Sequence, residues 1–445
     1  MKDSKSSAKV KSIVLIGCAL GFLAVVFLPR DEGPKPEEAV SRTSATSTSP
    51  EVNSVRYERW KQRVKSASGA SAEEYVANKV VQLGRSRREI VRAIGRRQKK
   101  EIPAEVESFF DALERGKWEE IDALFSGMAK RSAQYEGSTH SPELDPFWPA
   151  VLEAYGGAEQ AHLWPAEKLL DYGDAILGAL RPGMVYVGGT DPGRFIPTLL
   201  NASEAEPHIV ITQNALADSR YQEYLRFQYG DQFELPTEAD STRIFEEYVS
   251  GAEKRLQHDE DFPEEPKQLR PGENVQLVKG KVAVSGQAAV MAINEKLLQT
   301  ILQKNPEASF AMEESFPFSS TYADAAPLGP IMELRAAQLS FGEKEATETV
   351  KQWRETTQQL LNDPEGNSSP ETLKTYSHLA VSRANLLAAR NFPSEAEEAY
   401  RLAWKIFPDS TDAALGLAQF LSKIGRDDEA RRTLDAFRSR VPLAE

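Results

Sequence analysis

Five polar side chains follow two strand-like runs of the chain, and their types suit the recognition of a polar ligand. They come after the runs VYVGG and HIVIT: Asp191, Arg194, Gln213, Asn214 and Asp218. If the two strands pair in parallel, their carboxyl ends meet at one edge of the sheet, where ligands bind in open α/β folds. Carboxylate and amide oxygens accept hydrogen bonds from hydroxyl groups, and a guanidinium binds anions. The five residues therefore predict a site for a sugar or another small polar or anionic molecule.

The glycines after the first strand fit neither of the common phosphate loops. Gly188, Gly189 and Gly193 lack the spacing of G-x-G-x-x-G, and no Lys followed by Ser or Thr completes G-x-x-x-x-G-K-[ST]. The stretch is also typical of a strand that turns into a helix, with Asp191 as the N-cap and Pro192 at the first helical position. Asp218 has the same alternative role, as the cap of a second helix. The sequence leaves helix capping and ligand binding both open.

Other side chains with catalytic potential form no recognisable constellation. Glu313 and Glu314 end a strand-like run, where alternation directs one inward and one outward, so they do not form a carboxylate pair, although either could act as a general acid. Ser315 lacks the G-x-S-x-G context of a serine hydrolase. The five histidines show no ligand spacing, and the one cysteine, Cys18, cannot form an intramolecular disulfide. The sequence therefore predicts no metal site and no cofactor.

The elements that position these residues belong to a predicted mixed α/β domain over 182–340. MVYVGG, a helix, HIVITQ and a second helix follow one another at a spacing that argues for parallel strands joined by a right-handed crossover. A helix over 238–257, a hairpin over 275–286, an amphipathic helix and two further strands complete the pattern. The segment 316–330 is predicted to be a long polar and aromatic loop.

The C-terminal part contains an internal repeat of 34 residues. Pro408 and Pro442 are 34 positions apart, and small residues recur in register before each. The aligned pairs are Ala380 with Ala414, Ala384 with Ala418, Leu387 with Leu421, Ala396 with Ala430, Tyr400 with Leu434 and Ala403 with Phe437. This period, with small residues where helices meet and a terminal proline, is the tetratricopeptide pattern. The pattern departs at Arg383 and Phe437. Because about three repeats are needed for stability, a predicted helix over 344–362 must supply a further layer.

The N-terminus predicts a membrane anchor. Residues 12–29 are uncharged and follow four lysines; as a helix they would span about 27 Å, enough for a thin bilayer. The lysines favour a cytoplasmic N-terminus on the inner membrane, with the bulk of the chain extracytoplasmic. Leu15 to Cys18 resembles a lipoprotein cleavage box, but the longer apolar run after Cys18 favours an uncleaved anchor, with cleavage or lipidation as the alternative. Residues 30–53, rich in Pro, Ser, Thr and Glu, predict a disordered tether.

Charge is distributed unevenly along the 445 residues, whose net charge is −13. Residues 51–100 carry 14 Lys and Arg against 5 Asp and Glu. Such a segment could contact anionic lipid, nucleic acid or the acidic remainder of the protein, or it could be a solvated basic helix. It carries no recognisable nucleic-acid-binding motif, so no nucleic-acid partner is expected.

Together these patterns predict an α/β plus all-α protein with five parts. The parts are a signal anchor or transmembrane helix (1–29), a disordered linker (30–53), a helical region (54–181) with a hairpin over 104–132, a mixed α/β domain (182–340) and tetratricopeptide-like helical repeats (341–445).

Several stretches carry a resemblance to known proteins. HLWPAEKLLDYGDAILGAL, VYVGGTDPGRFIPTLL, HIVITQNALADSRYQEYL, VSGQAAVMAIN and FAMEESFPF together resemble an uncharacterised group of bacterial membrane-anchored tetratricopeptide proteins, over most of residues 75–440. The first strand, its Gly-Gly-x-Asp turn, and the second strand with its Asn-containing loop are similar to the soluble domain of multi-pass O-mannosyltransferase-like membrane proteins. Those proteins transfer lipid-linked sugars in a multi-pass membrane domain. This chain has one apolar span, so the resemblance implies at most an accessory or sugar-binding role.

The expected function is therefore that of a membrane-anchored, extracytoplasmic binding or scaffold protein. Its repeats would present a helical groove to a protein partner. The alternative is a glycan-related enzyme or accessory subunit with its polar-ligand site in the α/β domain.

Overall fold

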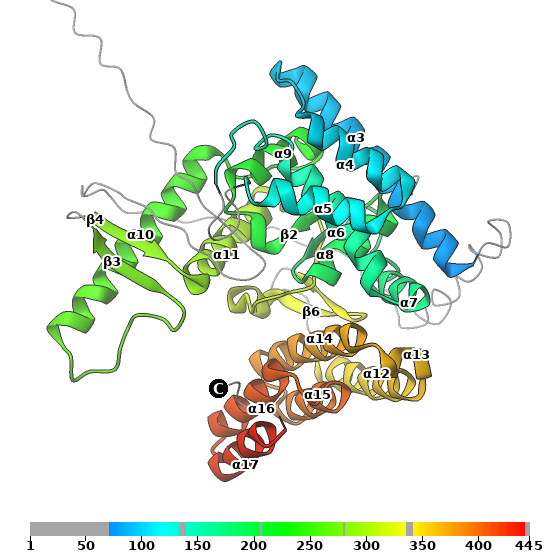
Figure 1. The fold of residues 1–445 in the computed structure, drawn as a ribbon. Helices are drawn as coiled ribbons and strands as arrows, with labels where there is room; N and C mark the ends of the chain where they lie inside the picture. The colour runs from blue at the N-terminus through cyan, green and yellow to red at the C-terminus, as the bar shows by residue number, and fades with distance from the viewer. Residues whose placement is uncertain (1–70, 133–138, 205–206, 279–280, 335–340, 441–445) are drawn as a thin grey trace, which may run out of the picture.

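The computed structural model (Figure 1) describes residues 71–132, 139–204, 207–278, 281–334 and 341–440. The described chain is mostly helical, with a small mixed sheet and C-terminal helical repeats. The predicted membrane span and the predicted tether lie outside these residues, so both stay predictions. Among the helices that the structure describes, none is long and apolar enough to cross a membrane.

In the described part of the chain before β1, residues 71–132 and 139–184, there are five helices. The hydroxyl of Ser71 accepts the N–H of Glu74 and the Glu74 carboxylate accepts the N–H of Ser71, a capping box that starts the first helix. The predicted hairpin over 104–132 is confirmed, with a turn at Gly116, whose φ of 65° favours glycine. The helices are α3 (Ala72–Gln98), α4 (Ala104–Arg115), α5 (Trp118–Ala129), α6 (Trp148–Leu163) and α7 (Ala166–Leu177).

Much of the basic charge of α3 is neutralised by the protein's own acidic side chains. Arg88 pairs with Glu107 of α4 at 2.6 Å and with Glu114 at 3.1 Å. Arg87 pairs with Glu153 of α6 at 2.6 Å, and both side chains are nearly buried. The sequence left anionic lipid, nucleic acid and the protein's own acidic residues open as partners of the basic segment. The structure shows the last of these, because arginines of α3 pair with glutamates of α4 and α6.

A five-stranded mixed sheet lies at the centre of the α/β part. Its order is β2-β1-β5-β7-β6. Strands β2, β1 and β5 are parallel; β7 is antiparallel to β5, and β6 is antiparallel to β7. The predicted parallel pairing of the first two strands is confirmed, with Tyr186 opposite Val210. The strands are β1 (Val185–Gly188), β2 (Val210–Thr212), β5 (Phe310–Met312), β6 (Ala325–Leu328) and β7 (Ile331–Leu334).

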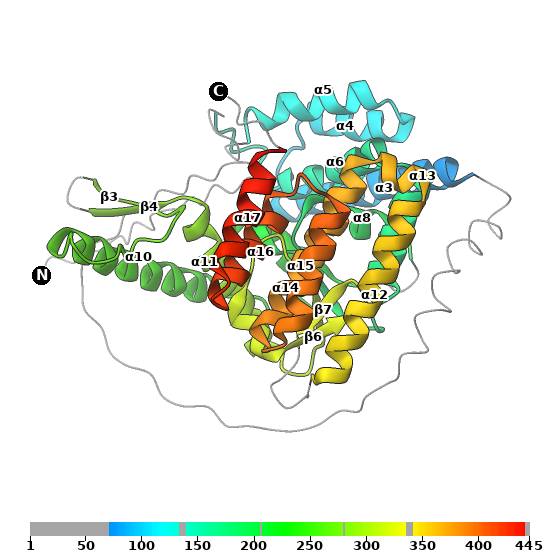
Figure 2. The same cartoon turned by 90° about the horizontal axis from the view of Figure 1, so that it is seen from below.

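Helices cover this sheet, and a two-stranded hairpin packs on two of the helices apart from the sheet (Figure 1). Helix α8 contacts β1 and β2, and α6 packs on α8. Gly156 of α6 allows this close approach, because a Cβ there would lie 2.4 Å from the ring of Phe195. The predicted hairpin is confirmed and lies beside α10 (Figures 1 and 2). These elements are α8 (Asp191–Asn201), α9 (Ser219–Tyr229), α10 (Glu238–Asp261), β3 (Asn274–Val278), β4 (Lys281–Ser285) and α11 (Gln287–Lys304).

The loop predicted over 316–330 is wrong in part. It contains a 3-10 helix, η2 (Ser319–Asp324), and the edge strand β6, which pairs with β7 around Gly329. Only four residues form β6, and one of them is Pro327, so no period-two pattern marks the strand in the sequence. Proline is tolerated there because an edge strand leaves one side of its backbone unpaired.

The C-terminal helices form the predicted repeats. The small residues Ala380, Ala384, Ala396 and Ala403 are completely buried where the helices meet, as the 34-residue pattern predicts. Helix α12 packs against α15 and supplies the predicted further layer. The helices are α12 (Glu343–Asn362), α13 (Pro364–Ser368), α14 (Pro370–Ala389), α15 (Pro393–Ile406), α16 (Thr411–Lys423) and α17 (Asp427–Arg438).

The first repeat helix, α14, packs directly on the sheet. It contacts η2, β6 and β7, and Figures 1 and 2 show it beside these strands. Arg383 is 2% exposed, and its Nη2 donates to the carbonyls of Gly329 (2.9 Å) and Ile331 (2.7 Å). The departure from the repeat pattern at Arg383 thus has a structural cause, because this side chain fastens the repeats to the β6–β7 turn.

Candidate functional site

The loop after β1 begins helix α8 one residue earlier than the sequence suggested. Thr190 is the N-cap, and its hydroxyl accepts the N–H of Gly193 at 3.0 Å. Asp191 and Pro192 occupy the first two helical positions. The prediction of Asp191 as the cap is therefore wrong, because the neighbouring threonine is also a good capping residue and takes that role.

The same loop holds an anionic group that belongs to the protein. Glu313, the residue after β5, is 1% exposed. Its Oε2 accepts the backbone N–H groups of Gly189 (2.8 Å) and Thr190 (2.9 Å), and its Oε1 accepts the Thr190 hydroxyl (2.8 Å). A Cβ on Gly193 would lie 2.0 Å from the Glu313 carboxylate, so glycine is required for this approach. The glycine loop thus binds a carboxylate where other βα loops bind an external anion.

Burial and hydrogen bonding shift the pKa of Glu313 in opposite directions. Burial raises the pKa of the Glu313 carboxyl above its ordinary value, whereas nearby His378 and the donors of Gly189 and Thr190 lower it. No local pattern indicates this role of Glu313, because Glu313 and Gly189 are 124 positions apart.

Gln213 and Asn214 connect the loops that follow the three parallel strands. Gln213 is fully buried; its Oε1 accepts the N–H of Ser315 at 2.8 Å and its Nε2 donates to the Phe316 carbonyl at 3.1 Å. Asn214 donates to the Gly189 carbonyl at 3.0 Å and accepts the Ser315 hydroxyl at 2.8 Å. Both side chains thus make several hydrogen bonds inside the protein.

Asp191 and Arg194 lie together on the first turn of α8. Asp191 Oδ1 accepts from Arg194 Nη2 at 2.6 Å, and the Asp191 side chain is 42% exposed. The Arg194 guanidinium stacks 4.2 Å from the ring centroid of Phe195, and its buried Nε has no hydrogen-bond partner within the described residues. Burial and the nearby Asp191 carboxylate raise the pKa of Glu159 on α6. The carboxylates of Asp191 and Glu159 therefore lie near the Arg194 guanidinium at this edge of the sheet.

Asp218 has a different set of neighbours. It caps α9 by accepting the N–H of Arg220 at 2.9 Å, and it pairs with the Arg220 guanidinium at 2.8 Å. Arg220 also donates to the Ser132 carbonyl at 2.7 Å and to Asp145 at 3.2 Å. The five predicted residues therefore divide into the pair Asp191 and Arg194, the two loop-connecting amides, and a helix cap.

Glu314 points away from Glu313, as strand alternation predicts, yet both side chains are 1% exposed. The Glu314 carboxylate accepts the hydroxyl of Tyr322 at 2.7 Å, and burial raises its pKa to about 7. The prediction that one of the two glutamates faces outward is wrong, because the repeats cover the side of the sheet edge that would otherwise be open. No group of three or more His, Cys, Asp or Glu in the described chain could hold a metal ion.

His378 on α14 joins the repeats to the end of β5. Its Nε2 lies 2.7 Å from the Glu314 carbonyl oxygen and its Nδ1 lies 3.3 Å from Asp412 of α16. Both ring nitrogens face acceptors, so the geometry favours the doubly protonated imidazolium. The Asp412 carboxylate, the Glu313 carboxylate and the Glu314 carbonyl overcome the effect of burial and raise the pKa of His378 to about 9. The sequence contains no signal for this contact.

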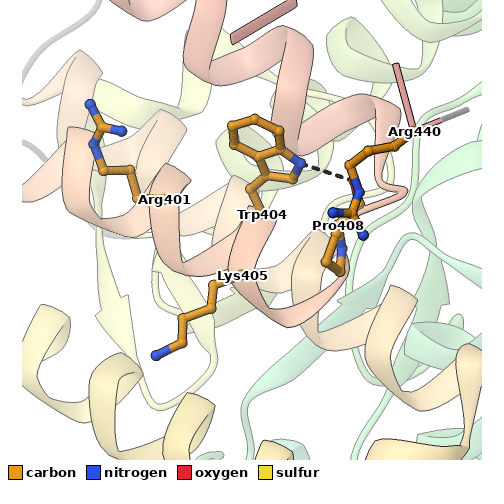
Figure 3. Close-up of a pocket in the computed structure, with 5 residues that line it drawn as sticks. All are labelled: Arg401, Trp404, Lys405, Pro408 and Arg440. Atoms are coloured by element: carbon orange, nitrogen blue, oxygen red, sulfur yellow. Dashed lines mark hydrogen bonds between the residues drawn. The ribbon is translucent and has the colours of Figure 1, made fainter. Parts of the chain in front are cut away.

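The outer side of the repeats carries a shallow pocket of about 260 Å³ (Figure 3). It is lined by Arg401, Trp404, Lys405, Pro408 and Arg440. Trp404 donates its indole N–H to the Pro408 carbonyl at 2.9 Å, which fixes the ring. Arg401 pairs with the glutamate one turn before it at 2.7 Å, whereas Lys405 forms no ion pair within the described residues. The pocket combines an ordered indole with three cationic side chains.

These features define a mostly helical protein in which a small mixed sheet is fastened to C-terminal helical repeats. A family model described as a tetratricopeptide repeat matches residues 387–443. Repeats of this kind generally mediate the binding of protein partners, which indicates an interaction or scaffold role. No curated protein and no solved structure matches the chain.

Proposed function

We propose that this protein is a single-pass, membrane-anchored, extracytoplasmic scaffold that binds a protein partner through its repeats. The tetratricopeptide match over 387–443 supports the binding role. The uncharged run over 12–29 and the lysines before it support the anchor and its orientation.

The observation that carries the proposal is the contrast between the two sides of the repeats. The side of α14 that faces the sheet is filled by the protein itself, since Arg383 and His378 there contact β-sheet backbone and the Glu314 carbonyl. The pocket around Trp404 and Lys405 lies on the α15–α17 side (Figure 3). Tryptophan and arginine are enriched among residues that dominate binding energy, so we place the partner there.

Charge reversal at the pocket tests this role. Full-length protein is recovered from membranes in detergent after cross-linking, and the cross-linked partners of the wild type and of Lys405→Glu are compared. We expect the variant to lose a partner that the wild type retains. Lys351→Glu reverses the charge of another exposed lysine, on α12; it is the control and should keep the partner. Equal recovery of every partner by all three proteins would contradict the proposal.

A second candidate function is polar-ligand binding by the α/β part, as a glycan-related enzyme or accessory subunit. It rests on the half-exposed Asp191 and on the buried Arg194 Nε, which no described residue satisfies. A thermal-shift screen of sugars and sugar nucleotides tests it, because a ligand that binds the native state raises the melting temperature. A rise that disappears in Arg194→Lys supports this function; no rise with any compound argues against it.

A further inference from the structure

The C-terminal end of α3 carries a dense cluster of cations. Four exposed residues form it, and we call them the α3 basic tip: Arg96, Arg97, Lys99 and Lys100. Between residues 91 and 104 of the sequence, Glu101 is the only acidic residue. Figure 1 shows this end of α3 at the top of the view, on the opposite side of the molecule from the repeats. The α3 basic tip is therefore separate from the outer pocket of Trp404.

The basic residues earlier in α3 are compensated by the protein itself, whereas those of the tip are not. All five basic residues of α3 before the tip form ion pairs: Lys79, Arg85, Arg87, Arg88 and Arg92. In the described parts of the chain, none of the four tip residues forms an ion pair or a side-chain hydrogen bond. The Arg97 guanidinium lies 5.6 Å from the ring centroid of Phe227 on α9. The uncompensated charge of the helix is thus concentrated at one end.

The backbone holds these cations in an ordered turn. Lys99 has a φ of 54°, and the N–H of Lys100 donates to the Gly95 carbonyl at 3.0 Å, which closes the end of the helix. Because successive helical residues are about 100° apart, Arg96 and Arg97 lie on different sides of the helix, and Lys99 and Lys100 follow its last residue. The charges therefore surround the end of α3 and do not form one stripe along it.

We propose that the α3 basic tip docks end-on against a bilayer surface that contains anionic phospholipid. Each lysine or arginine close to such a surface strengthens association about fivefold. A broad array of phosphate headgroups matches cations that surround a helix end, whereas a nucleic-acid strand is bound along a groove that follows its backbone. This inference rests on the membrane anchor of the proposed function and not on partner binding by the repeats.

The predicted anchor leaves the tip within reach of the bilayer. About 40 residues separate the predicted span from α3, and they can extend to at most roughly 130 Å. The 27 residues of α3 span about 40 Å, so either end of the helix could meet the membrane. The first turn of α3 carries Glu73 and Glu74, which an anionic surface repels. Charge therefore selects the C-terminal end as the contact.

Hydrogen exchange of the full-length protein in lipid nanodiscs tests the proposal. Discs of phosphatidylcholine alone are compared, at low salt, with discs that also contain phosphatidylglycerol. We expect exchange over residues 96–103 to slow at least about threefold in the anionic discs, and about 0.5 M salt should reverse the effect because it screens the charges. Equal exchange of this segment in the two kinds of disc would overturn the proposal.

Two double variants with the same change of charge provide the matched comparison. Lys99→Gln/Lys100→Gln should weaken docking about 30-fold, because two cations are lost, and should abolish the slowed exchange. Lys344→Gln/Lys423→Gln removes two exposed lysines of the repeats and should keep it. Each variant is compared with itself in phosphatidylcholine, so a local change in the helix end cancels. Loss of the effect in both variants would contradict a specific contact at the tip.

Further arms separate the anchor and other partners from the tip. Phosphatidylcholine has no net charge, so incorporation into those discs depends on the anchor alone. If the chain stays outside them, the anchor is wrong, and sedimentation with phosphatidylglycerol vesicles decides the tip by itself. Retention that is lost in Lys99→Gln/Lys100→Gln supports the tip, and no retention contradicts it. A short single-stranded RNA or polyglutamate that slows exchange over 96–103 more than the anionic lipid does would also overturn the proposal.

Discussion

The carboxylate of Glu313 accepts the backbone N–H of Gly189 at 2.8 Å across two neighbouring parallel strands. The same carboxylate accepts the N–H and the hydroxyl of Thr190. These donors would otherwise be available to an external anion at the carboxyl ends of the parallel strands. The loop is therefore an anion-binding turn whose anion is supplied by the protein.

Removing this carboxylate should destabilise the α/β part. Glu313→Gln directs an amide N–H at the N–H groups of Gly189 and Thr190, and we expect it to lower the free energy of unfolding by about 2 kcal/mol. Urea denaturation measures the change. Glu314→Gln is the control and should cost less than about 1 kcal/mol, because a carboxyl with a pKa of about 7 is half protonated at neutral pH and an amide resembles its protonated form. Equal losses would contradict the anchoring role of Glu313.

Thr190, the N-cap of α8, and Asp191, its first helical residue, should differ in their effect on stability. Thr190→Val removes the hydroxyl that accepts the Gly193 N–H and donates to Glu313, so we expect a loss of about 1–2 kcal/mol. Asp191→Asn removes a charge at the helix N-terminus together with the part-exposed ion pair to Arg194, and it should cost less than about 1 kcal/mol. Thermal unfolding of the two variants distinguishes them. A larger effect at Asp191 would restore it as the cap.

The His378 contact should make stability depend on pH. The folded state raises the pKa of His378 from 6.5 to about 9, so its contribution is complete below pH 6.5 and is lost as the pH rises through 9. The shift corresponds to a loss of at most about 3 kcal/mol over that window. The unfolding midpoint of the wild type, measured from pH 6 to 9.5, should fall accordingly.

His378→Gln cannot titrate and should flatten the dependence above about pH 8, where Glu314, with a pKa of about 7, is already ionised. Asp412→Asn removes the negative charge beside Nδ1 of His378 and should reduce the dependence in part. If the wild type and His378→Gln respond alike to pH, the imidazolium does not join the repeats to the sheet.

Arg383 should control the attachment of the repeats to the sheet. Arg383→Ala leaves the Gly329 and Ile331 carbonyls without their donor and opens a cavity, so we expect a loss of about 3 kcal/mol. Hydrogen exchange should increase most in β6 and β7. Arg401→Ala, on the exposed side of α15, should change stability by less than about 0.5 kcal/mol. Unchanged exchange in β6 and β7 would show that Arg383 is not the fastening residue.

Local patterns in the sequence were sufficient to predict most helices and strands, but they did not predict the contacts of the candidate site. The 34-residue register predicted the buried alanines of the repeats, and strand–helix alternation predicted that β1 pairs with β2 in parallel. Strand β6 is short and contains Pro327, so periodicity could not reveal it. For Asp218 the sequence allowed either helix capping or ligand binding, and in the structure Asp218 caps α9.

The contacts that organise the site join residues far apart in the chain. Glu313 meets Gly189 across 124 positions, and Arg383 meets Ile331 across 52. Arg383 was visible in the sequence only as a departure from the repeat pattern. Its contact with the β6–β7 turn depends on how the repeats pack against the sheet, which no local pattern encodes.

The most direct test of the scaffold role is the affinity of the cross-linked partner for variants of the outer pocket. Once that partner is identified, its dissociation constant is measured with the full-length wild type, Trp404→Ala and Phe262→Ala. The last removes an aromatic ring that is 52% exposed at the end of α10, away from the repeats. A central tryptophan in an interface contributes about 2 kcal/mol or more, so Trp404→Ala should weaken binding about 30-fold and Phe262→Ala should not. Equal affinity of all three proteins would contradict partner binding at the repeats.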